Sequence, residues 1–204
     1  MMTSYEESLA AMHGVEVFRR LRSARVGVAG LGGMGSHTAV SLARAGIGTL
    51  VLADYDRVDS TNLARQDYTS ADVGRSKAEA LADRIAGLGC GTRVESHDVI
   101  ITQDNACSIF SGCDVVCEAF DRPDQKAMLV ETLLSGDPDV QVVSCSGMAG
   151  FGPASEITTS RRLSRLTVCG DGSTDVSGTG LVAPRVMVCA GHEALAAVRI
   201  ILGI

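Results

Sequence analysis

Short runs of apolar or alternating residues are separated along the chain by longer segments of helix-forming residues, and this order predicts the fold. The short runs are typical of strands, and they lie at 25–30, 49–53, 92–99, 114–120 and 139–147. The segments between them predict helices at 34–46, 74–89, 103–112 and 124–135. Strands and helices that alternate in this way usually form a parallel sheet covered on both faces. We therefore expect an α/β fold, Rossmann-like and doubly wound, with a mainly parallel sheet.

Both ends of the chain extend this pattern. One helix is expected over 5–22, where apolar residues recur every three positions, and another over 184–202. After Gly150 the pattern weakens to one or two short strands, and 170–180, rich in glycine, serine and threonine, is expected to be a mobile loop. The chain is thus expected to be one domain. Its parts are an N-terminal helix (1–24), a Rossmann-like core (25–150) and a small irregular C-terminal extension (151–204).

Composition and charge narrow the class of protein. The formal net charge of −6 at pH 7 argues against a general binder of nucleic acid or of a membrane surface. The first residues lack the basic and apolar stretches of a signal peptide, and the apolar stretch 181–204 is interrupted by charges. The seven cysteines include no C-x-x-C pair, so we expect free thiols in a reducing compartment and no zinc. The expected location is the cytoplasm, without membrane or nucleic-acid partners.

The segment GLGGMG at 30–35 fits the G-x-G-x-x-G pattern of nucleotide-binding turns. Gly30, Gly32 and Gly35 hold the fixed positions, directly after an expected strand and at the start of an expected helix. Bare backbone there lets a phosphate approach amide groups at the positive end of the helix. Asp54 lies at the end of the next strand, where an acid can accept hydrogen bonds from a ribose. The expected ligand is a nucleotide.

The residues after this second strand indicate which nucleotide. Asn62, Arg65 and Gln66 follow in a loop, and Lys77 lies near the start of the next helix. An arginine fork and a lysine point charge suit a triphosphate better than a redox cofactor. Asp121 follows a later strand, at the carboxyl edge of the sheet, where a carboxylate can hold Mg²⁺ between phosphates. This set favours ATP with Mg²⁺.

Several stretches carry a resemblance to a known family. AGLGGMGSHTAVSLARAGIGTLVLADYDRVDSTNLARQ (29–66) and GRSKAEAL (74–81) resemble the ThiF/MoeB/HesA adenylyltransferases, which are relatives of the ubiquitin-activating enzymes. CEAFDRPDQKAML (117–129) and GLVAPRVMVCAGHEALAAVRIILG (180–203) extend the likeness, which is greatest to the short ThiF branch. The resemblance implies ATP-dependent adenylylation of a ubiquitin-fold sulfur carrier, ThiS-like and ending in Gly-Gly, for thiamine thiazole synthesis. It also implies a homodimer.

The same resemblance implies roles for individual residues. Carried over, they are Gly33 against the nucleotide, Asp54 on the ribose, Asn62 and Arg65 on the phosphates, Lys77 on the α/β region and Asp121 on Mg²⁺. Arg65, Lys77 and Asp121 would form the catalytic set. Some members of this family use a cysteine to form an acyl-disulfide with the carrier. Cys169 ends an apolar run beside the expected mobile loop, which makes it a candidate for an accessible sulfur-transfer nucleophile; the alternative is a cysteine at a strand end without a chemical role.

Three features depart from the family pattern. The chain lacks the two C-x-x-C pairs that hold structural zinc in full-length relatives. Many relatives carry an R-x-x-R-Q segment whose arginine reaches the partner subunit's site, and Arg19, Arg20 and Arg22 offer no single counterpart. After the metal-binding acid the chain reads DRPDQK instead of D-N-x-x-T-R, which leaves Arg122 and Lys126 as alternatives for the family's cation.

Other functions stay open on the sequence alone. A same-family enzyme could activate another carrier or the carboxylate of a modified tRNA base, although the acidic composition counts against tRNA. An NAD-binding oxidoreductase would account for the glycine turn and Asp54 but would leave Asn62, Arg65 and Lys77 without a role. A non-catalytic nucleotide-binding module would bind ATP without exchanging pyrophosphate.

Overall fold

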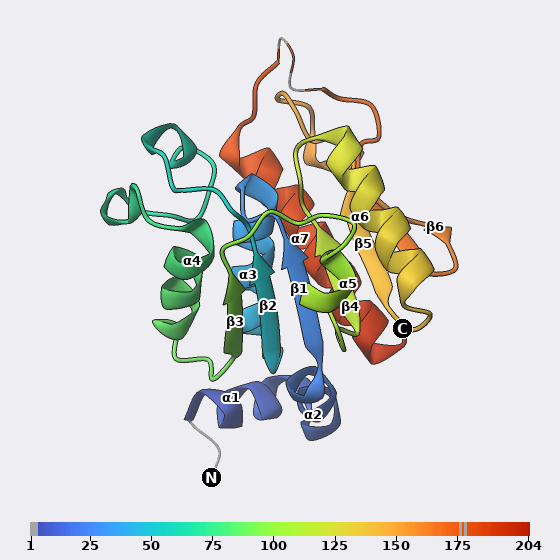
Figure 1. The fold of residues 1–204 in the computed structure, drawn as a ribbon. Coiled ribbons are helices and arrows are strands. Elements are labelled where there is room, and N and C mark those ends of the chain that lie inside the picture. The colour runs from blue at the N-terminus through green and yellow to red at the C-terminus, as the bar shows by residue number, and fades with distance from the viewer. Residues whose placement is uncertain (1–3, 176, 178) are drawn as a thin grey trace.

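A computed structural model of the chain describes residues 4–175, 177 and 179–204, and in this part seven strands form one sheet (Figure 1). The strand order is β3-β2-β1-β4-β5-β7-β6. Neighbouring strands are parallel except β6, which runs antiparallel to β7. The strands are β1 (Arg25–Ala29), β2 (Thr49–Ala53), β3 (Arg93–His97), β4 (Val115–Glu118), β5 (Gln141–Cys145), β6 (Thr158–Leu163) and β7 (Leu166–Gly170). The structure thus confirms the predicted α/β fold with a mainly parallel sheet.

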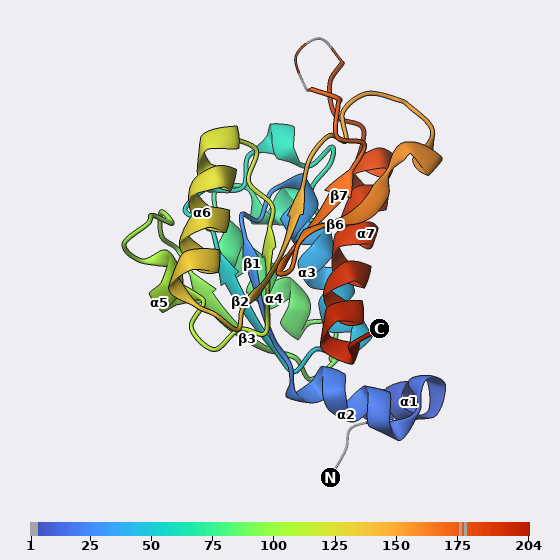
Figure 2. The same cartoon turned by 90° about the vertical axis from the view of Figure 1, so that its right-hand side faces the viewer.

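Helices cover both faces of this sheet, as Figure 2 shows. α3, α4 and α7 pack on one face, and α5 and α6 pack on the other. Their bounds are α3 (Gly33–Ala45), α4 (Lys77–Ala86), α5 (Ala106–Ile109), α6 (Pro123–Gly136) and α7 (Ala183–Leu202). Three short 3₁₀ turns lie between them, η1 (Ser60–Asn62), η2 (Ser70–Asp72) and η3 (Ala154–Glu156).

The N-terminal segment lies across the end of the sheet at which the strands begin (Figure 1). The prediction of one helix over 5–22 is wrong, because the segment forms two helices, α1 (Ser4–His13) and α2 (Val15–Ser23). Gly14 separates them with a φ of +88°, a left-handed conformation that glycine adopts without strain and that a continuous helix cannot contain. Leu9 of α1 packs against the end of α3, so both helices stay attached to the core.

Each face of the sheet has its own aliphatic core. The larger core lies between the sheet and α3, α4 and α7, and the smaller core lies under α5 and α6. Gly27 in β1 makes room for the one buried aromatic ring of the smaller core, since a Cβ at this position would lie 2.5 Å from Phe110 Cδ1. Phe110 therefore packs directly on the central strand.

The C-terminal part of the chain completes the sheet. The one or two short strands expected after Gly150 are β6 and β7. Residues 176 and 178 of the expected mobile loop lie outside the described residues. No helix in the described part of the chain combines the length and the apolar character that crossing a membrane requires.

Candidate nucleotide site

The ends of three strands bring the predicted site residues to one edge of the sheet. Ala29 at the end of β1 is the register partner of Ala53 in β2 and of Glu118 in β4. The glycine turn, Asp54 and the segment after β4 therefore leave the sheet side by side. β1 is flanked by β2 on one side and β4 on the other, so the connections diverge at this point. Open α/β sheets bind ligands at such a switch point, beyond the carboxyl ends of the strands.

The outer glycines of the turn let two backbone segments approach closely. A Cβ on Gly30, whose φ is +84°, would lie 2.9 Å from the Phe120 ring and 3.1 Å from the Ala119 carbonyl oxygen. A Cβ on Gly35 would lie 1.8 Å from the Gly30 carbonyl oxygen. Only glycine fits at these two positions, and α3 consequently begins directly on the end of β1.

The inner glycines face the loop that follows β2. A Cβ on Gly32 would lie 3.7 Å from Gln66 Nε2, and a Cβ on Gly33 would lie 3.5 Å from the Arg65 carbonyl oxygen. The structure thus brings the glycine turn and the Arg65–Gln66 pair together, as the sequence predicts.

Asp54 anchors the glycine turn from the end of β2. The residue is buried, and its carboxylate accepts a 2.6 Å hydrogen bond from the Leu31 amide and a 2.8 Å bond from the Asp56 amide. Burial raises the pKa of this carboxyl group, while the Lys77 ammonium and the two amides act against the rise. Each carboxylate oxygen has a second lone pair, so Asp54 can also accept a hydrogen bond from a ribose hydroxyl.

Lys77 is the first residue of α4, and its side chain is only 6 % exposed. Its ammonium lies 2.6 Å from the carboxylate of Asp56, whose side chain is 47 % exposed. The Tyr68 hydroxyl lies 2.9 Å from the Leu31 carbonyl oxygen and 3.4 Å from the Lys77 carbonyl oxygen. Tyr68 therefore ties the glycine turn to the start of α4, a role that the sequence did not reveal.

The loop between β2 and α4 carries three more of the predicted site residues. The Asn62 side-chain oxygen accepts a 3.2 Å hydrogen bond from the Asp59 amide and closes a capping box around η1. The Arg65 guanidinium donates to the Thr61 carbonyl oxygen at 3.3 Å. Gln66 is buried, and within the described residues its amide oxygen has no hydrogen-bond partner. Because an unpaired buried acceptor is costly, Gln66 can gain by accepting a hydrogen bond from a ligand.

Asp121 is exposed and follows the end of β4 by three residues. The motif that it begins holds two cations in different surroundings, because Arg122 pairs with Asp124 on the surface whereas Lys126 pairs with buried Glu118. Sequence reasoning missed Glu118. A charge inside an apolar strand must have a partner, and this signal in VVCEAF would have found it.

Of the two alternatives for Cys169, the structure does not support an accessible thiol. Its side chain is fully buried between β6 and α7, and burial raises the pKa of the thiol to about 11, although the Thr159 hydroxyl acts against the rise. The Thr159 hydroxyl oxygen lies 3.5 Å from the sulfur and 2.9 Å from His192 Nδ1. A sulfur-transfer role for Cys169 stays a prediction, and it requires β6 and α7 to separate.

Arg185, near the start of α7, joins several segments beside the site. Its guanidinium is almost fully buried and lies 3.1 Å from the Glu156 carboxylate and 2.8 Å from the Asp171 carboxylate. It also donates to two backbone carbonyl groups of the segment after β5. The next residue, Val186, packs on the glycine turn, since a Cβ on Gly33 would lie 3.1 Å from its Cγ1. The sequence did not single out this link.

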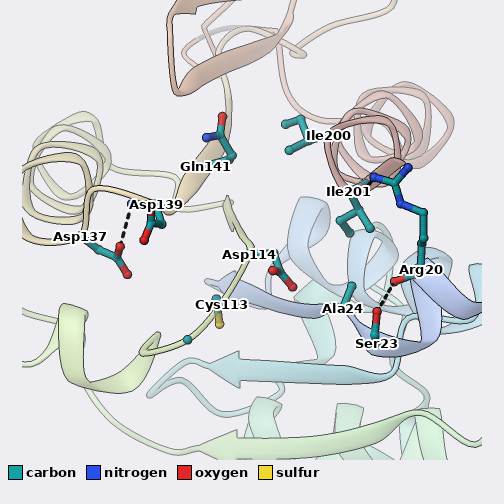
Figure 3. Close-up of a pocket in the computed structure, with 11 residues that line it drawn as sticks. Arg20, Ser23, Ala24, Cys113, Asp114, Asp137, Asp139, Gln141, Ile200 and Ile201 are labelled. Carbon is teal, nitrogen blue, oxygen red and sulfur yellow. Dashed lines mark hydrogen bonds between the residues drawn. The ribbon is translucent and has the colours of Figure 1, made fainter. Parts of the chain in front are cut away.

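A cavity of about 500 Å³ lies at the opposite edge of the sheet (Figure 3). Its lining includes Arg20 of α2, Asp114 before β4 and Gln141 of β5, and none of the predicted site residues. The Arg20 guanidinium donates to the carbonyl oxygens of Ile201 and Leu202, both at 2.8 Å, and so caps the end of α7. This cavity is separate from the candidate nucleotide site.

The fold and the site together define a class. A glycine turn after β1, an acid after β2 and cations from the next loop and helix are the features of a doubly wound nucleotide-binding protein. Comparison with protein families makes the assignment specific. The chain belongs to the ThiF family, whose model matches residues 5–204.

The curated relatives are similar in sequence to part of this chain. The probable adenylyltransferase/sulfurtransferase MoeZ of Mycobacterium tuberculosis is 38 % identical over 129 residues, which are 62 % of this chain and 33 % of MoeZ. The tRNA threonylcarbamoyladenosine dehydratase of Escherichia coli is 38 % identical over 123 residues, which are 59 % of this chain and 46 % of the dehydratase. The match therefore spans a third to a half of the length of these relatives.

Solved structures share the fold over almost all of the chain. The E. coli tRNA N6-threonylcarbamoyladenosine dehydratase in complex with AMP has a TM-score of 0.87 at 24 % identity, and the match covers 97 % of this chain and 93 % of that one. E. coli MccB with ATP has a TM-score of 0.73 at 22 % identity, covering 92 % of this chain and 58 % of that one.

Proposed function

We propose that the protein is an ATP-dependent adenylyltransferase that activates the C-terminal glycine carboxylate of a ubiquitin-fold sulfur carrier of the ThiS type. The observation that carries the proposal is the placement of Lys77 and Arg65 around the glycine turn and Asp54 at the switch point of the sheet. Family membership supports the reaction class, and the relative MoeZ is named a probable adenylyltransferase. The choice of a ThiS-type carrier rests on the resemblance to short ThiF proteins.

The proposed binding mode assigns each group a part of ATP. The helix that begins at Gly33 directs its first amides toward a phosphate, and the neighbouring Arg65 and Lys77 add positive charge. Asp54 accepts hydrogen bonds from the ribose, and Gln66 offers its unpaired amide oxygen to the nucleotide. Asn62 closes the capping box in the loop that carries Arg65. From this position in the loop Asn62 is proposed to contact the phosphates.

The proposed chemistry needs positioning more than acid–base catalysis. The carrier's terminal carboxylate is ionised at neutral pH and attacks the α-phosphorus directly, so no side chain has to remove a proton. The bond to the β-phosphate breaks, pyrophosphate leaves and an acyl-adenylate remains. Arg65 and Lys77 neutralise the charge that grows on the phosphate oxygens and hold the reacting groups in line.

The donor groups near the site fit Mg²⁺ carried by a triphosphate. Mg²⁺ in such sites uses one or two protein carboxylates and takes its other ligands from phosphates and water. Exposed Asp121 supplies one carboxylate at the carboxyl edge. In the described part of the chain no group of three or more histidine, cysteine or acidic residues is placed to hold a metal ion. When bound, Mg²⁺ would neutralise the phosphates and the leaving pyrophosphate.

ATP–pyrophosphate exchange tests the proposal. Exchange should require Mg²⁺ and a carrier that ends in Gly-Gly, and it should be lost with a carrier lacking its last glycine and in Lys77→Ala. ATP binding without exchange, whichever carrier is added, would favour a non-catalytic nucleotide-binding module. If the protein bound NAD tightly and did not bind ATP, the result would favour an oxidoreductase.

A second candidate substrate is the carboxylate of a modified tRNA base. The observation in its favour is the 38 % identity to the E. coli tRNA threonylcarbamoyladenosine dehydratase. The net charge of −6 opposes a large RNA interface. Exchange or ATP turnover that depends on tRNA, and on no carrier protein, would select this candidate.

A homodimer is part of the proposal. Arg20 caps α7 and Arg22 bonds to Glu6 and Gly91, whereas Arg19 is exposed and only loosely paired with Glu16. α2 lies at the edge of the sheet opposite to the glycine turn (Figure 1). Arg19 can therefore serve a nucleotide site only in another subunit. Sedimentation equilibrium, and exchange by a mixture of Arg19→Ala and Lys77→Ala proteins, test this assignment.

A further inference from the structure

The motif DRPDQK offers two cations near Asp121, and the structure separates them. The Lys126 ammonium lies 3.2 and 3.1 Å from the two carboxylate oxygens of Glu118. Glu118 is fully buried and the Lys126 side chain is 22 % exposed. Arg122 instead pairs with Asp124, and both of these side chains are more than half exposed. Of the two cations, Lys126 is the one built into the interior beside the site.

Glu118 fixes the turn that ends β4. Its Oε1 accepts a 2.7 Å hydrogen bond from the Phe120 amide, and its Oε2 accepts a 2.5 Å bond from the Ser144 hydroxyl on β5. The Lys126 ammonium comes from the first turn of α6 and bridges both oxygens. Two strands and a helix therefore meet at one carboxylate, and all of its partners are donors.

The same turn forms a wall of the candidate nucleotide site. The Phe120 ring and the Ala119 carbonyl oxygen pack over Gly30, at 2.9 and 3.1 Å from the position of a Cβ there. The Ala119 amide donates to the last carbonyl oxygen of β1 at 2.9 Å. Asp121 follows this turn directly. Any shift of Glu118 therefore moves Asp121 relative to the glycine turn.

We infer that Lys126 and Glu118 form a positioning pair, which holds Asp121 where a Mg²⁺–triphosphate requires it; this inference rests on the proposed function. Lys126 needs no contact with the nucleotide. Its ammonium bridges both oxygens of the buried Glu118 carboxylate, which also accept from the Phe120 amide and the Ser144 hydroxyl. Without the ammonium, the fully buried carboxylate has no cation beside it, which is costly enough to displace the side chain. The turn then loses a bond and Asp121 loses its fixed place.

Calorimetry of ATP binding in Mg²⁺ and in EDTA tests the pair. In the wild type, Mg²⁺ is expected to tighten ATP binding. Lys126→Met is expected to lose about tenfold of this Mg²⁺ enhancement, the loss typical when a residue that orients a metal ligand is removed. Its ATP affinity in EDTA should change little. Lys126→Arg keeps the charge and should keep most of the enhancement, and Arg122→Ala, the matched control from the same motif, should keep all of it.

A second variant protects the test against a failure to fold. Lys126→Met leaves a buried carboxylate unpaired, so the double variant Lys126→Met/Glu118→Gln, which buries no charge, is measured beside it. Because a glutamine side chain has one acceptor oxygen, the double variant should show the same loss. Full Mg²⁺ enhancement of ATP binding in either folded variant would overturn the inference. So would an equal loss of this enhancement in Arg122→Ala, or a wild type whose ATP affinity is the same in Mg²⁺ and in EDTA. Failure of the proposed function shows separately, as absence of pyrophosphate exchange by the wild type.

Discussion

Lys77 Nζ and Asp56 Oδ2 lie 2.6 Å apart, so the cation predicted to bind phosphates already has a carboxylate partner within the protein. The two residues differ in their surroundings, because Lys77 is buried whereas about half of the Asp56 side chain faces solvent. Asp56 thus fixes the position of the ammonium without enclosing it. A phosphate that approaches from the solvent side can replace Asp56 as the partner of the Lys77 ammonium, or pair with the ammonium beside Asp56.

Lys77→Met should lower the rate of ATP–pyrophosphate exchange about a hundredfold, since losing one preorganised cation costs about 3 kcal/mol in a transition state of this kind. Asp56→Asn, which leaves the ammonium without its partner, should not weaken ATP binding in EDTA. Exchange kinetics and calorimetry measure the two effects. Unchanged exchange in a folded Lys77→Met protein would remove Lys77 from the catalytic set.

Asp54→Asn should destabilise the protein by about 1–3 kcal/mol, because an amide has one acceptor oxygen where the carboxylate accepts from both the Leu31 and Asp56 amides. The NH₂ group of the asparagine would face one of these two backbone amides, and two donors cannot form a hydrogen bond. Urea unfolding measures the change. Asp83→Asn, at an exposed position on α4, serves as control and should stay within about 0.5 kcal/mol of the wild type. Equal stability of the two variants would contradict the anchoring role of Asp54.

Glu193→Gln should remove a pH dependence of stability. Glu193 is fully buried in α7, and burial raises the pKa of its carboxyl group to about 8, although the Thr38 hydroxyl and the Lys126 ammonium lower it. An unfolded glutamate titrates near 4.5. Between these values the folded state binds more protons, so the wild type should lose stability as pH rises, by up to about 1.4 kcal/mol per pH unit.

Urea unfolding at pH 5 and pH 8 measures this dependence. The wild type should be less stable at pH 8 than at pH 5, and Glu193→Gln should show the smaller difference and be the more stable protein at pH 8. Parallel pH profiles of the two proteins would show that Glu193 is ionised in the folded state.

Arg185→Met should cost about 3–5 kcal/mol of stability, because it leaves the buried Asp171 carboxylate without its cation. Although burial raises the pKa of Asp171, the Thr174 hydroxyl, the Thr174 and Ser173 amides and Arg185 together hold it well below its usual range. Arg199→Met on the exposed face of the same helix is the matched control. A loss of less than 1 kcal/mol would mean that the segments after β5 and β7 are held by other contacts.

Cys107 should react first with iodoacetamide in the native protein. It is the half-buried member of the seven cysteines, whereas Cys169 and the other five are buried. The thiolate is the reactive form, and a raised pKa slows Cys169 further. Mass spectrometry of timed samples locates the label. Early labelling of Cys169 would show that β6 and α7 separate in solution.

The fold could be predicted because its signals are local. The apolar run 25–30 and the glycine turn after it specify a strand followed by a helix, and the structure contains both. The prediction of a single helix over 5–22 was wrong because the regular apolar spacing continues across Gly14 and gives no sign of a break. The φ of +88° at Gly14 depends on how α1 and α2 pack on the rest of the protein. Strand β4 ends at Glu118, before Phe120, because the Phe120 amide donates its hydrogen bond to the Glu118 carboxylate.

The site was predictable only where a motif marked it. Asp54, Arg65 and Lys77 were predicted as site residues from their order after the glycine turn, and their roles stay predictions. Glu118 could have been found from its charge inside the apolar run VVCEAF, although its partner Ser144 could not. Arg185 was missed because a single sequence gives no sign of its pairing with Glu156. The burial of Cys169 left two alternatives open for the same kind of reason, because the sequence cannot show that α7 covers it.

The pairing of α3 with α7 has a consequence for synthesis. Thr38 and Glu193 share a 2.6 Å hydrogen bond across 155 residues of chain, and α7 also covers β4, β5 and β7. While the ribosome is still making the chain, α3 and α4 can pack on this face, but the cover that α7 gives to β4, β5 and β7 is missing until α7 emerges. Such late, long-range closure slows folding and exposes apolar strands. Nascent chains of this protein should therefore depend on chaperones until α7 has emerged from the ribosome, and chains interrupted before residue 183 should aggregate.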